Sequence, residues 1–449
     1  MYDVDVFASP PAHLSVEARI TTTTTGSFAL VAPSASVSSG TDVEGLVATD
    51  DRGRPVVVQP AANGYHVAAP AGAVRFRYRL DFQNGVALSS TGAGLNETHL
   101  YAVGRGVFVA PDPAAYGRER PYPVIRVHFI TPPGWHVVTA WGVDEDAYAP
   151  PTSGALFGTT LAAAPDYRIY RDTAGGTPFV LAVRGERHFS DSALEQVIAG
   201  SLRRASETLG GVPVPEVTYT SDLGWKGRTS GSLQGRASVG LIWEPGELLG
   251  LARTHDLFHE TLHLWFGGAM DTDRWWTEGV TDYFAARLEA EWSGRPEDLA
   301  DLCYQSLRNY QHIERDTSMT MDQEQRENVL GDNTTLLVYR KGMLAGLLLD
   351  GAIRRATDGE ATLGDLARRM LAYARQAPDR RVSDARIRDY ALEVGGPAVE
   401  RVWRQVVAGT ALISEADVTD ALRAVTGLPV AAPAPIAKER KSLIGHPKP

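Results

Sequence analysis

The spacing of hydrophobic residues along the chain changes once, from a period of two to a period near 3.6. In the first 184 residues, short runs that alternate hydrophobic and polar residues are separated by Pro, Gly and Asn, as at 74–80 and 124–129. Alternation of this kind predicts strands with one buried face. The threonine run at 21–25 adds β-branched residues that suit an exposed strand. We therefore expect an N-terminal all-β domain over residues 1–184.

Helical spacing begins near Ser190, which starts a capping sequence for a helix that reaches about residue 209. Residues 217–243 again have the pattern of strands and turns. The remaining pattern predicts helices over about 247–266, 276–292, 296–314, 334–356, 362–376, 383–394, 397–408 and 414–426. We expect a mixed α+β domain over 185–295 and an α-helical domain over 296–428. The Pro/Ala/Lys-rich residues 429–449 are predicted to form a disordered tail.

Length and composition fit this multidomain organisation. A chain of 449 residues exceeds the size at which one hydrophobic core stops growing. Hydrophobic residues make up 43% and charged residues 22%, as in ordinary globular proteins. The net charge of −10 argues against a nucleic-acid partner. Because Cys303 is the single cysteine, intramolecular disulfides and cysteine-based zinc sites are excluded.

No segment has the pattern of a membrane span or a secretory signal. The longest apolar stretch, 343–349, is too short to cross a bilayer. The start, MYDVDVFASPP, lacks a basic region followed by an apolar core. We expect a soluble protein, which is cytoplasmic if Met1 is the native start and otherwise periplasmic or secreted. The number of subunits stays open.

The strongest chemical signal is the motif HExxH at residues 259–263. On a helix, residues four apart lie on one face, so His259 and His263 can reach the same ion. Neutral imidazole is a good zinc ligand. Glu260 lies beside that face, where it can take a proton from a water molecule without ligating the metal. The simpler alternative is a chance occurrence with ordinary histidines, and the helical setting counts against it.

A second helix supplies a third candidate ligand. Glu278 follows His263 after fourteen intervening residues, which leaves room for one tight loop and an antiparallel helix. A catalytic zinc site needs three protein ligands and an open position. Asp282, four residues after Glu278, could accept a hydrogen bond from a ligating histidine; the alternative is a solvated carboxylate. His255 aligns with the ligands, and we expect a supporting or structural role for it.

These motifs resemble those of the gluzincin metallopeptidases, within them the glycyl aminopeptidase family. The sequences HETLHLWFGG (259–268) and WWTEGVTDYF (275–284) carry the likeness. Residues 339–342 match the family's Tyr-x-Lys-Gly helix, 121–135 resemble the close of its β domain, and 407–410 resemble the end of its helical domain. The resemblance implies a thermolysin-like catalytic domain between the β domain and the helical domain.

The resemblance also implies roles for particular residues. Tyr339 would donate a hydrogen bond to the oxyanion of the tetrahedral intermediate. A strand that relatives use to bind the substrate corresponds to residues 231–235, so Leu233, Gln234 and Gly235 are candidate substrate-binding residues. Relatives carry a glutamate at the position of Gln234, which holds the free amino group of the substrate. An amide in its place retains one hydrogen bond and loses the charge.

Together these observations predict one zinc ion per chain and a peptide substrate. The activity that the resemblance implies is that of an aminopeptidase for small N-terminal residues. Because of Gln234, a metallopeptidase of altered specificity, acting internally or on blocked N-termini, is the alternative. A third possibility is an inactive peptide-binding protein, against which the intact HExxH motif and the presence of Glu278 and Tyr339 argue.

Overall fold

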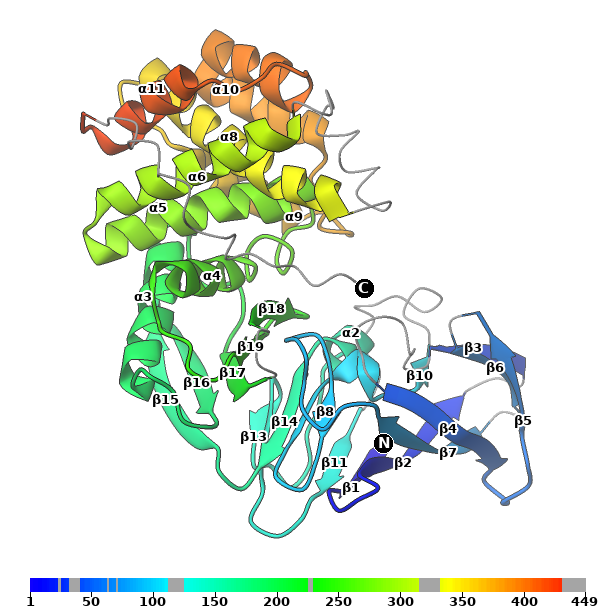
Figure 1. Cartoon of the computed structure of the whole chain (residues 1–449). Coiled ribbons are helices and arrows are strands. Elements are labelled where there is room, and N and C mark those ends of the chain that lie inside the picture. The colour runs from blue at the N-terminus through cyan, green and yellow to red at the C-terminus, as the bar shows by residue number, and fades with distance from the viewer. Residues whose placement is uncertain are drawn as a thin grey trace. The chain divides into compact units, whose positions relative to one another are not determined.

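The computed structural model describes residues 1–22, 26–31, 41–62, 64–69, 72–111, 125–224, 229–314 and 332–429 (Figure 1). The chain forms two compact units. The first contains residues 1–172, 178–191 and 214–248, and the second contains 173–177, 192–213 and the residues from 249 onward. The predicted disordered tail lies, from residue 430, outside the described residues. The three-domain boundaries expected from the sequence stay a prediction.

Two sheets of the first unit are formed by the earliest strands of the chain. One has the order β11-β1-β2-β7-β4, and its strands pair antiparallel except for β1 with β11. The other has the order β10-β3-β6-β5. The strands are β1 (Tyr2–Phe7), β2 (His13–Thr22), β3 (Gly26–Val31), β4 (Thr41–Asp50), β5 (Val57–Ala61), β6 (Gly64–Ala69), β7 (Gly72–Phe82), β10 (Ala110–Pro111) and β11 (Val127–Ile130).

The alternation that predicted strands is visible in β7. Val74, Phe76, Tyr78 and Leu80 are buried, whereas Arg75 between them is exposed. Successive side chains of a strand point to opposite faces, so one face joins the core and the other meets solvent. The N-terminal all-β region is confirmed. The expected strand at 124–129 begins later, at Val127, and the threonines at 23–25 lie outside the described residues.

A third sheet, of order β13-β12-β14-β9-β8, and a fourth, of order β15-β16-β17-β19-β18, complete the sheets described in this unit. In the fourth sheet β16, β17 and β19 are parallel, and β18 pairs antiparallel at the edge. The elements are β8 (Gly94–Leu95), β9 (Leu100–Val103), η1 (Gly104–Gly106), β12 (His136–Thr139), β13 (Gly142–Val143), α2 (Ser153–Phe157), β14 (Thr160–Ala164), β15 (Arg168–Ala174), β16 (Thr177–Val183), β17 (Val217–Leu223), β18 (Ser230–Gln234) and β19 (Ser238–Trp243).

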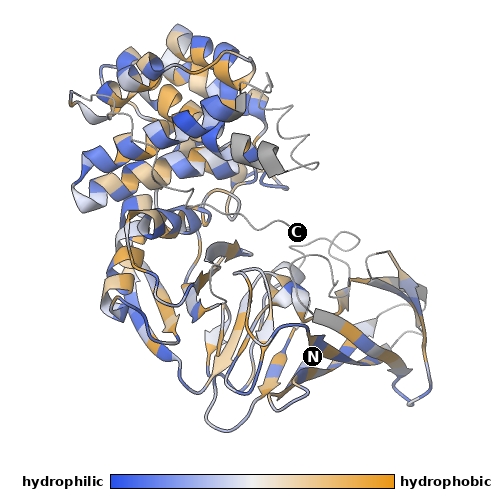
Figure 2. Ribbon diagram, in the orientation of Figure 1, coloured by the Kyte–Doolittle hydropathy of each residue, from blue (hydrophilic) through white to orange (hydrophobic). Residues whose placement is uncertain are grey.

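The second unit is helical, and hydrophobic and hydrophilic residues are interspersed along its helices (Figure 2). Such spacing gives each helix one apolar stripe to bury. The elements are α3 (Asp191–Leu209), α4 (Leu251–Leu262), η2 (Trp275–Val280), α5 (Thr281–Ser293), α6 (Pro296–Glu314), α8 (Asp332–Ala356), α9 (Leu363–Ala374), α10 (Asp384–Val402), η3 (Trp403–Val407) and α11 (Glu415–Thr426). No helix among the described residues combines the length and apolarity needed to cross a membrane.

The helices differ from the sequence prediction in two places. α4 begins at Leu251 because Gly250 is its extended N-cap, and the Glu247 carboxylate, expected within the helix, accepts hydrogen bonds from Thr229 and the Glu244 amide. The two helices expected at 383–394 and 397–408 form the kinked element α10 and the π-helical turn η3. The kink lies at Gly396, whose φ of 55° is accessible to glycine at little cost.

Candidate metal centre

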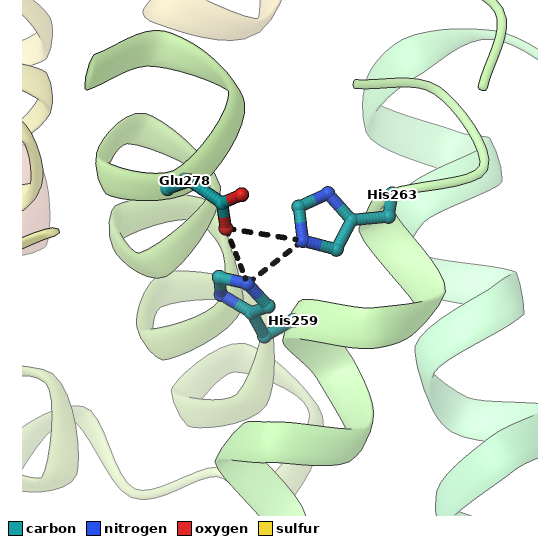
Figure 3. Close-up of side chains that lie close together, drawn as sticks. All are labelled: His259, His263 and Glu278. Atoms are coloured by element: carbon teal, nitrogen blue, oxygen red, sulfur yellow. Dashed lines mark hydrogen bonds and ion pairs between the residues drawn. The ribbon is translucent and has the colours of Figure 1, made fainter. Parts of the chain in front are cut away.

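Three side chains from two neighbouring helical segments converge on one point in the second unit (Figure 3). His259 lies in the last turn of α4, and His263 is the residue that caps its end. Glu278 lies on η2, a π-helical turn that runs directly into α5. π-helical turns are rare and occur often at functional sites. The tight loop and returning helix expected from the spacing therefore bring Glu278 to the two histidines.

The three facing atoms have the separations of a metal site. His259 Nε2 and His263 Nε2 are 2.9 Å apart, and Glu278 Oε2 is 3.6 Å and 3.5 Å from them. Ligands at about 2.1 Å from a tetrahedral zinc ion are about 3.4 Å from one another. The described residues fit a tetrahedral ion with three protein ligands and one remaining position.

A hydrogen bond at Nδ1 orients each imidazole so that its Nε2 faces the centre. His259 Nδ1 donates to Asp282 Oδ1 at 2.8 Å, and His263 Nδ1 donates to the carbonyl oxygen of Phe266 at 2.9 Å. With the protons at Nδ1, both Nε2 atoms carry lone pairs. Two lone pairs and a carboxylate oxygen repel one another unless a cation lies between them. When both imidazoles are neutral, this donor set therefore fits a bound cation.

The electrostatics of the site agree with this reading. Burial disfavours the charged form of His259, but the carboxylates of Asp282 and Glu278 outweigh it and raise the pKa of His259 well above its ordinary value. The pKa of His263 is raised as well, through Glu278. Conversely, the imidazoles hold the pKa of Glu278 and of Asp282 well below the usual range despite burial. The site therefore favours positive charge between these carboxylates.

Glu260 follows the first ligand in α4 and lies near the centre. Burial raises the pKa of its carboxyl group, and the neighbouring His263 and His259 oppose that rise. A base with a raised pKa holds a captured proton more firmly than an ordinary glutamate does, which suits a group that must accept a proton and then release it. No described contact places Glu260 in the ligand set.

Tyr339 of α8 borders the same centre. Its ring stacks on that of His259, with centroids 6.1 Å apart and planes inclined by 25°. Its hydroxyl is hydrogen-bonded to Glu278, and burial together with this carboxylate raises the pKa of the phenol well above its ordinary value. The hydroxyl therefore stays protonated and can donate.

The close approach of α8 and η2 is what brings Tyr339 there. A Cβ on Gly279 would lie 2.5 Å from the Cα of Gly342 and 2.5 Å from the carbonyl oxygen of Val338. Only glycines at both positions allow the two backbones to come so near. This contact brings Tyr339, about sixty positions after Glu278 in the sequence, next to the Glu278 side chain.

The Asp282 side chain is buried and lies close to several basic side chains. Besides His259, its carboxylate faces His255 Nε2 at 3.3 Å and Arg340 Nη1 at 3.8 Å. The exposed carboxylate considered as an alternative from the sequence is not what the structure contains. Sequence reasoning missed Arg340, for which the pattern offered no signal besides its position next to Tyr339.

The candidate substrate-binding residues Leu233 and Gln234 lie on β18 of the first unit, and Gly235 follows it. Gln234 is 4% exposed, and its Nε2 donates to Ser232 Oγ at 2.5 Å. Leu233 pairs with Val239 of β19. Gly235 has a φ of 61°, and its backbone touches that of Gly158, so a side chain there would clash. Close packing against Gly158 thus explains the glycine at position 235 without any role in substrate binding.

Solved structures define the class of protein to which this fold corresponds. An aminopeptidase N family protein from Idiomarina loihiensis matches with a TM-score of 0.78 and 16% identity, over 94% of this chain and 77% of that chain. An M1 zinc metallopeptidase from Deinococcus radiodurans matches with a TM-score of 0.58 and 16% identity, over 92% and 94%. The chain has the fold of M1 zinc metallopeptidases.

A protein-family model also matches the first part of the chain. Residues 1–168 match the Peptidase M61 N-terminal domain. Together with the fold, this match confirms the resemblance to zinc metallopeptidases. None of the curated proteins matches the sequence. A variant of the Deinococcus radiodurans enzyme bound to a Tyr-Ser-Ala substrate shares the fold with a TM-score of 0.58 at 16% identity, over 92% of this chain and 94% of that chain.

Proposed function

We propose that this protein hydrolyses peptide bonds with a zinc ion held by His259, His263 and Glu278. The observation that carries the proposal is the convergence of three lone-pair atoms within 3.6 Å, with the two imidazoles locked at Nδ1. Histidine and glutamate ligands with one open position are the set used by hydrolytic zinc sites. The fold and the M61 domain support a peptide as substrate.

The chain's own residues supply the proton transfer and the oxyanion contact. When bound, zinc provides Lewis acidity, which lowers the pKa of water and polarises the scissile carbonyl. Glu260 takes the proton of the attacking water and delivers it to the leaving amine. Tyr339 donates to the carbonyl oxygen as negative charge develops there. Asp282 keeps His259 in the tautomer that presents Nε2.

Within this activity we propose an aminopeptidase for small N-terminal residues, as the resemblance implies. The resemblance also leaves the alternative of altered specificity, because it places Gln234 where relatives have glutamate, and the Gln234 amide is already hydrogen-bonded to Ser232. A neutral amide binds an ammonium group without ion pairing. Free and blocked N-termini are then distinguished poorly.

Metal content and hydrolysis test the proposal together. Purified wild-type protein should contain about one zinc per chain by mass spectrometry, and the His259→Ala/His263→Ala double variant almost none. Glu260→Gln should keep the metal and lose at least about 100-fold in kcat/KM on unblocked peptides, because the amide cannot accept a proton. Full zinc retention in the double variant, or wild-type turnover by Glu260→Gln, would refute the assignment.

The role of Gln234 is tested by comparing free and N-acetylated peptides. Gln234→Glu should favour the free amine by about 1–3 kcal/mol, roughly a five- to hundredfold change in the ratio of kcat/KM values. Ser232 Oγ can donate to the new carboxylate, so the strand should stay intact. Gln234→Met, which removes the amide and adds no charge, is the matched control. A wild-type enzyme that strictly requires a free amine would contradict this role.

A further inference from the structure

A line of buried groups continues from the metal centre into the interior of the second unit. Asp282 Oδ1 accepts from His259 Nδ1 and faces His255 Nε2 at 3.3 Å. On the far side of the imidazole, His255 Nδ1 lies 3.9 Å from Glu289 Oε2 of α5. The side chain of Glu289 is only 3% exposed and that of His255 12%. The groups follow one another as His259, Asp282, His255 and Glu289.

Among the described residues, the last two atoms of this line have no hydrogen-bond partner. Both His255 Nδ1 and Glu289 Oε2 are buried without a hydrogen bond. Buried polar atoms are rarely left in that state. A hydrogen bond between them needs about 2.8 Å, so a movement of about 1 Å by the carboxyl group completes it.

Protonation states fix the direction of that hydrogen bond. His255 Nε2 faces the Asp282 carboxylate and donates to it, so in the neutral imidazole Nδ1 is an acceptor. Glu289 must then donate. Burial, together with Asp298 of α6 and Asp256 of α4, raises the pKa of Glu289 to about 8, and Arg295 opposes this only in part. The carboxyl group is protonated at neutral pH and has a proton to give.

We propose that Glu289 is a positioning residue of the metal centre: it donates to His255 and thereby holds His255 as the second donor to Asp282, which orients the ligand His259. This inference rests on the proposed zinc site. Partners beyond the ligands fix the orientation and basicity of the ligating imidazole, and their loss lowers metal affinity. A glutamate eleven positions after Glu278 thus contributes to zinc binding without approaching the ion.

The test is zinc affinity, measured by competition with a chromophoric chelator at pH 7. Glu289→Leu should weaken zinc binding about tenfold or more, whereas Glu289→Gln should stay within about threefold of wild type, because the amide also donates. Glu291→Leu is the control, since Glu291 lies on the same helix but is 45% exposed. The free energy of unfolding of each metal-free variant is measured by denaturant titration to separate affinity from stability.

A double-mutant cycle covers the case in which Glu289→Leu does not fold. His255→Phe should weaken zinc binding by a similar factor, and adding Glu289→Gln or Glu289→Leu to it should change nothing further, because Glu289 acts only through His255. Unchanged affinity in Glu289→Leu and His255→Phe would overturn the proposal. So would equal losses in Glu289→Gln and Glu289→Leu, or additive losses in the cycle. A wild-type protein without zinc affinity would instead refute the zinc site itself.

Discussion

At the scale of single residues, the two histidines are alike in sequence and differ in what holds them. His259 is fixed by the carboxylate of Asp282, and His263 by the carbonyl oxygen of Phe266 at the end of its own helix. A carboxylate partner increases the basicity of an imidazole more than a neutral carbonyl does. The two candidate ligands would therefore donate to a bound ion with different strength.

Tyr339 offers the sharpest single-residue prediction. Tyr339→Phe removes the hydroxyl and keeps the ring that stacks on His259. We expect kcat to fall roughly 10²- to 10³-fold, as for other losses of one oxyanion donor, with unchanged zinc content. Steady-state kinetics on an unblocked peptide and metal analysis of the same sample measure both. A variant with wild-type kcat would show that the phenol does not act on the intermediate.

At the scale of elements, the packing of α8 against η2 joins the tyrosine to the metal ligands. The contact depends on two glycines, Gly279 and Gly342, whose backbones lie too close for a side chain. Gly342 follows Tyr339 by three residues, so it lies on the same face of α8. The position of the phenol is thus set by a helix contact and not by the tyrosine's own sequence neighbours.

Gly342→Ala should displace α8 from η2. The added Cβ would meet the carbonyl oxygen of Trp275 at 2.5 Å, and forced overpacking of this kind costs about 1–3 kcal/mol of stability. We expect kcat to fall with the zinc content retained, and little further loss when Tyr339→Phe is added.

Gly351→Ala provides the comparison for this variant. Its Cβ would approach Ala421 of α11 at 3.0 Å, on the same helix but away from the centre. Denaturant unfolding and steady-state kinetics of both variants should show a stability loss in each and a kcat loss only in Gly342→Ala. Equal kcat in the two variants would contradict the role of the α8–η2 contact.

At the scale of the whole molecule, every candidate ligand lies in the second unit. Asp282 and Tyr339 belong to that unit too. An ion that binds only the folded form stabilises it in proportion to the logarithm of its concentration over its dissociation constant. Metal binding at the proposed site would therefore be coupled to the folding of the second unit.

Removal of the metal should lower the temperature of thermal unfolding. Zinc at 100 times its dissociation constant stabilises by about 2.7 kcal/mol, which corresponds to roughly 5–10 °C for a unit of this size. Scanning calorimetry with and without chelator measures the shift. The His259→Ala/His263→Ala double variant should show none. A chelator effect of equal size in that variant would place the stabilising ion elsewhere.

The sequence by itself determined what depends on neighbours along the chain. The alternation at 74–80 fixed a strand with one buried face, and the bounds of 296–314 agree with those of α6. His259 and His263 had to share a face because a helix places residues four apart on one side. Glu278 could be expected nearby because a short loop leaves few ways for the next helix to return.

Tertiary structure decided which distant groups meet. The chain has sixteen tyrosines, and the sequence pattern does not show which of them lies at the metal centre. The resemblance pointed to Tyr339, and in the structure the glycine contact of α8 with η2 brings Tyr339 there. The choice of Asp282 as partner of His259, and the approach of Glu289 to His255, depend on how α4 and α5 face each other. Periodicity predicts which face of a helix is buried. How a neighbouring helix is rotated, and how near it lies, follow from the close packing of side chains that are far apart in sequence.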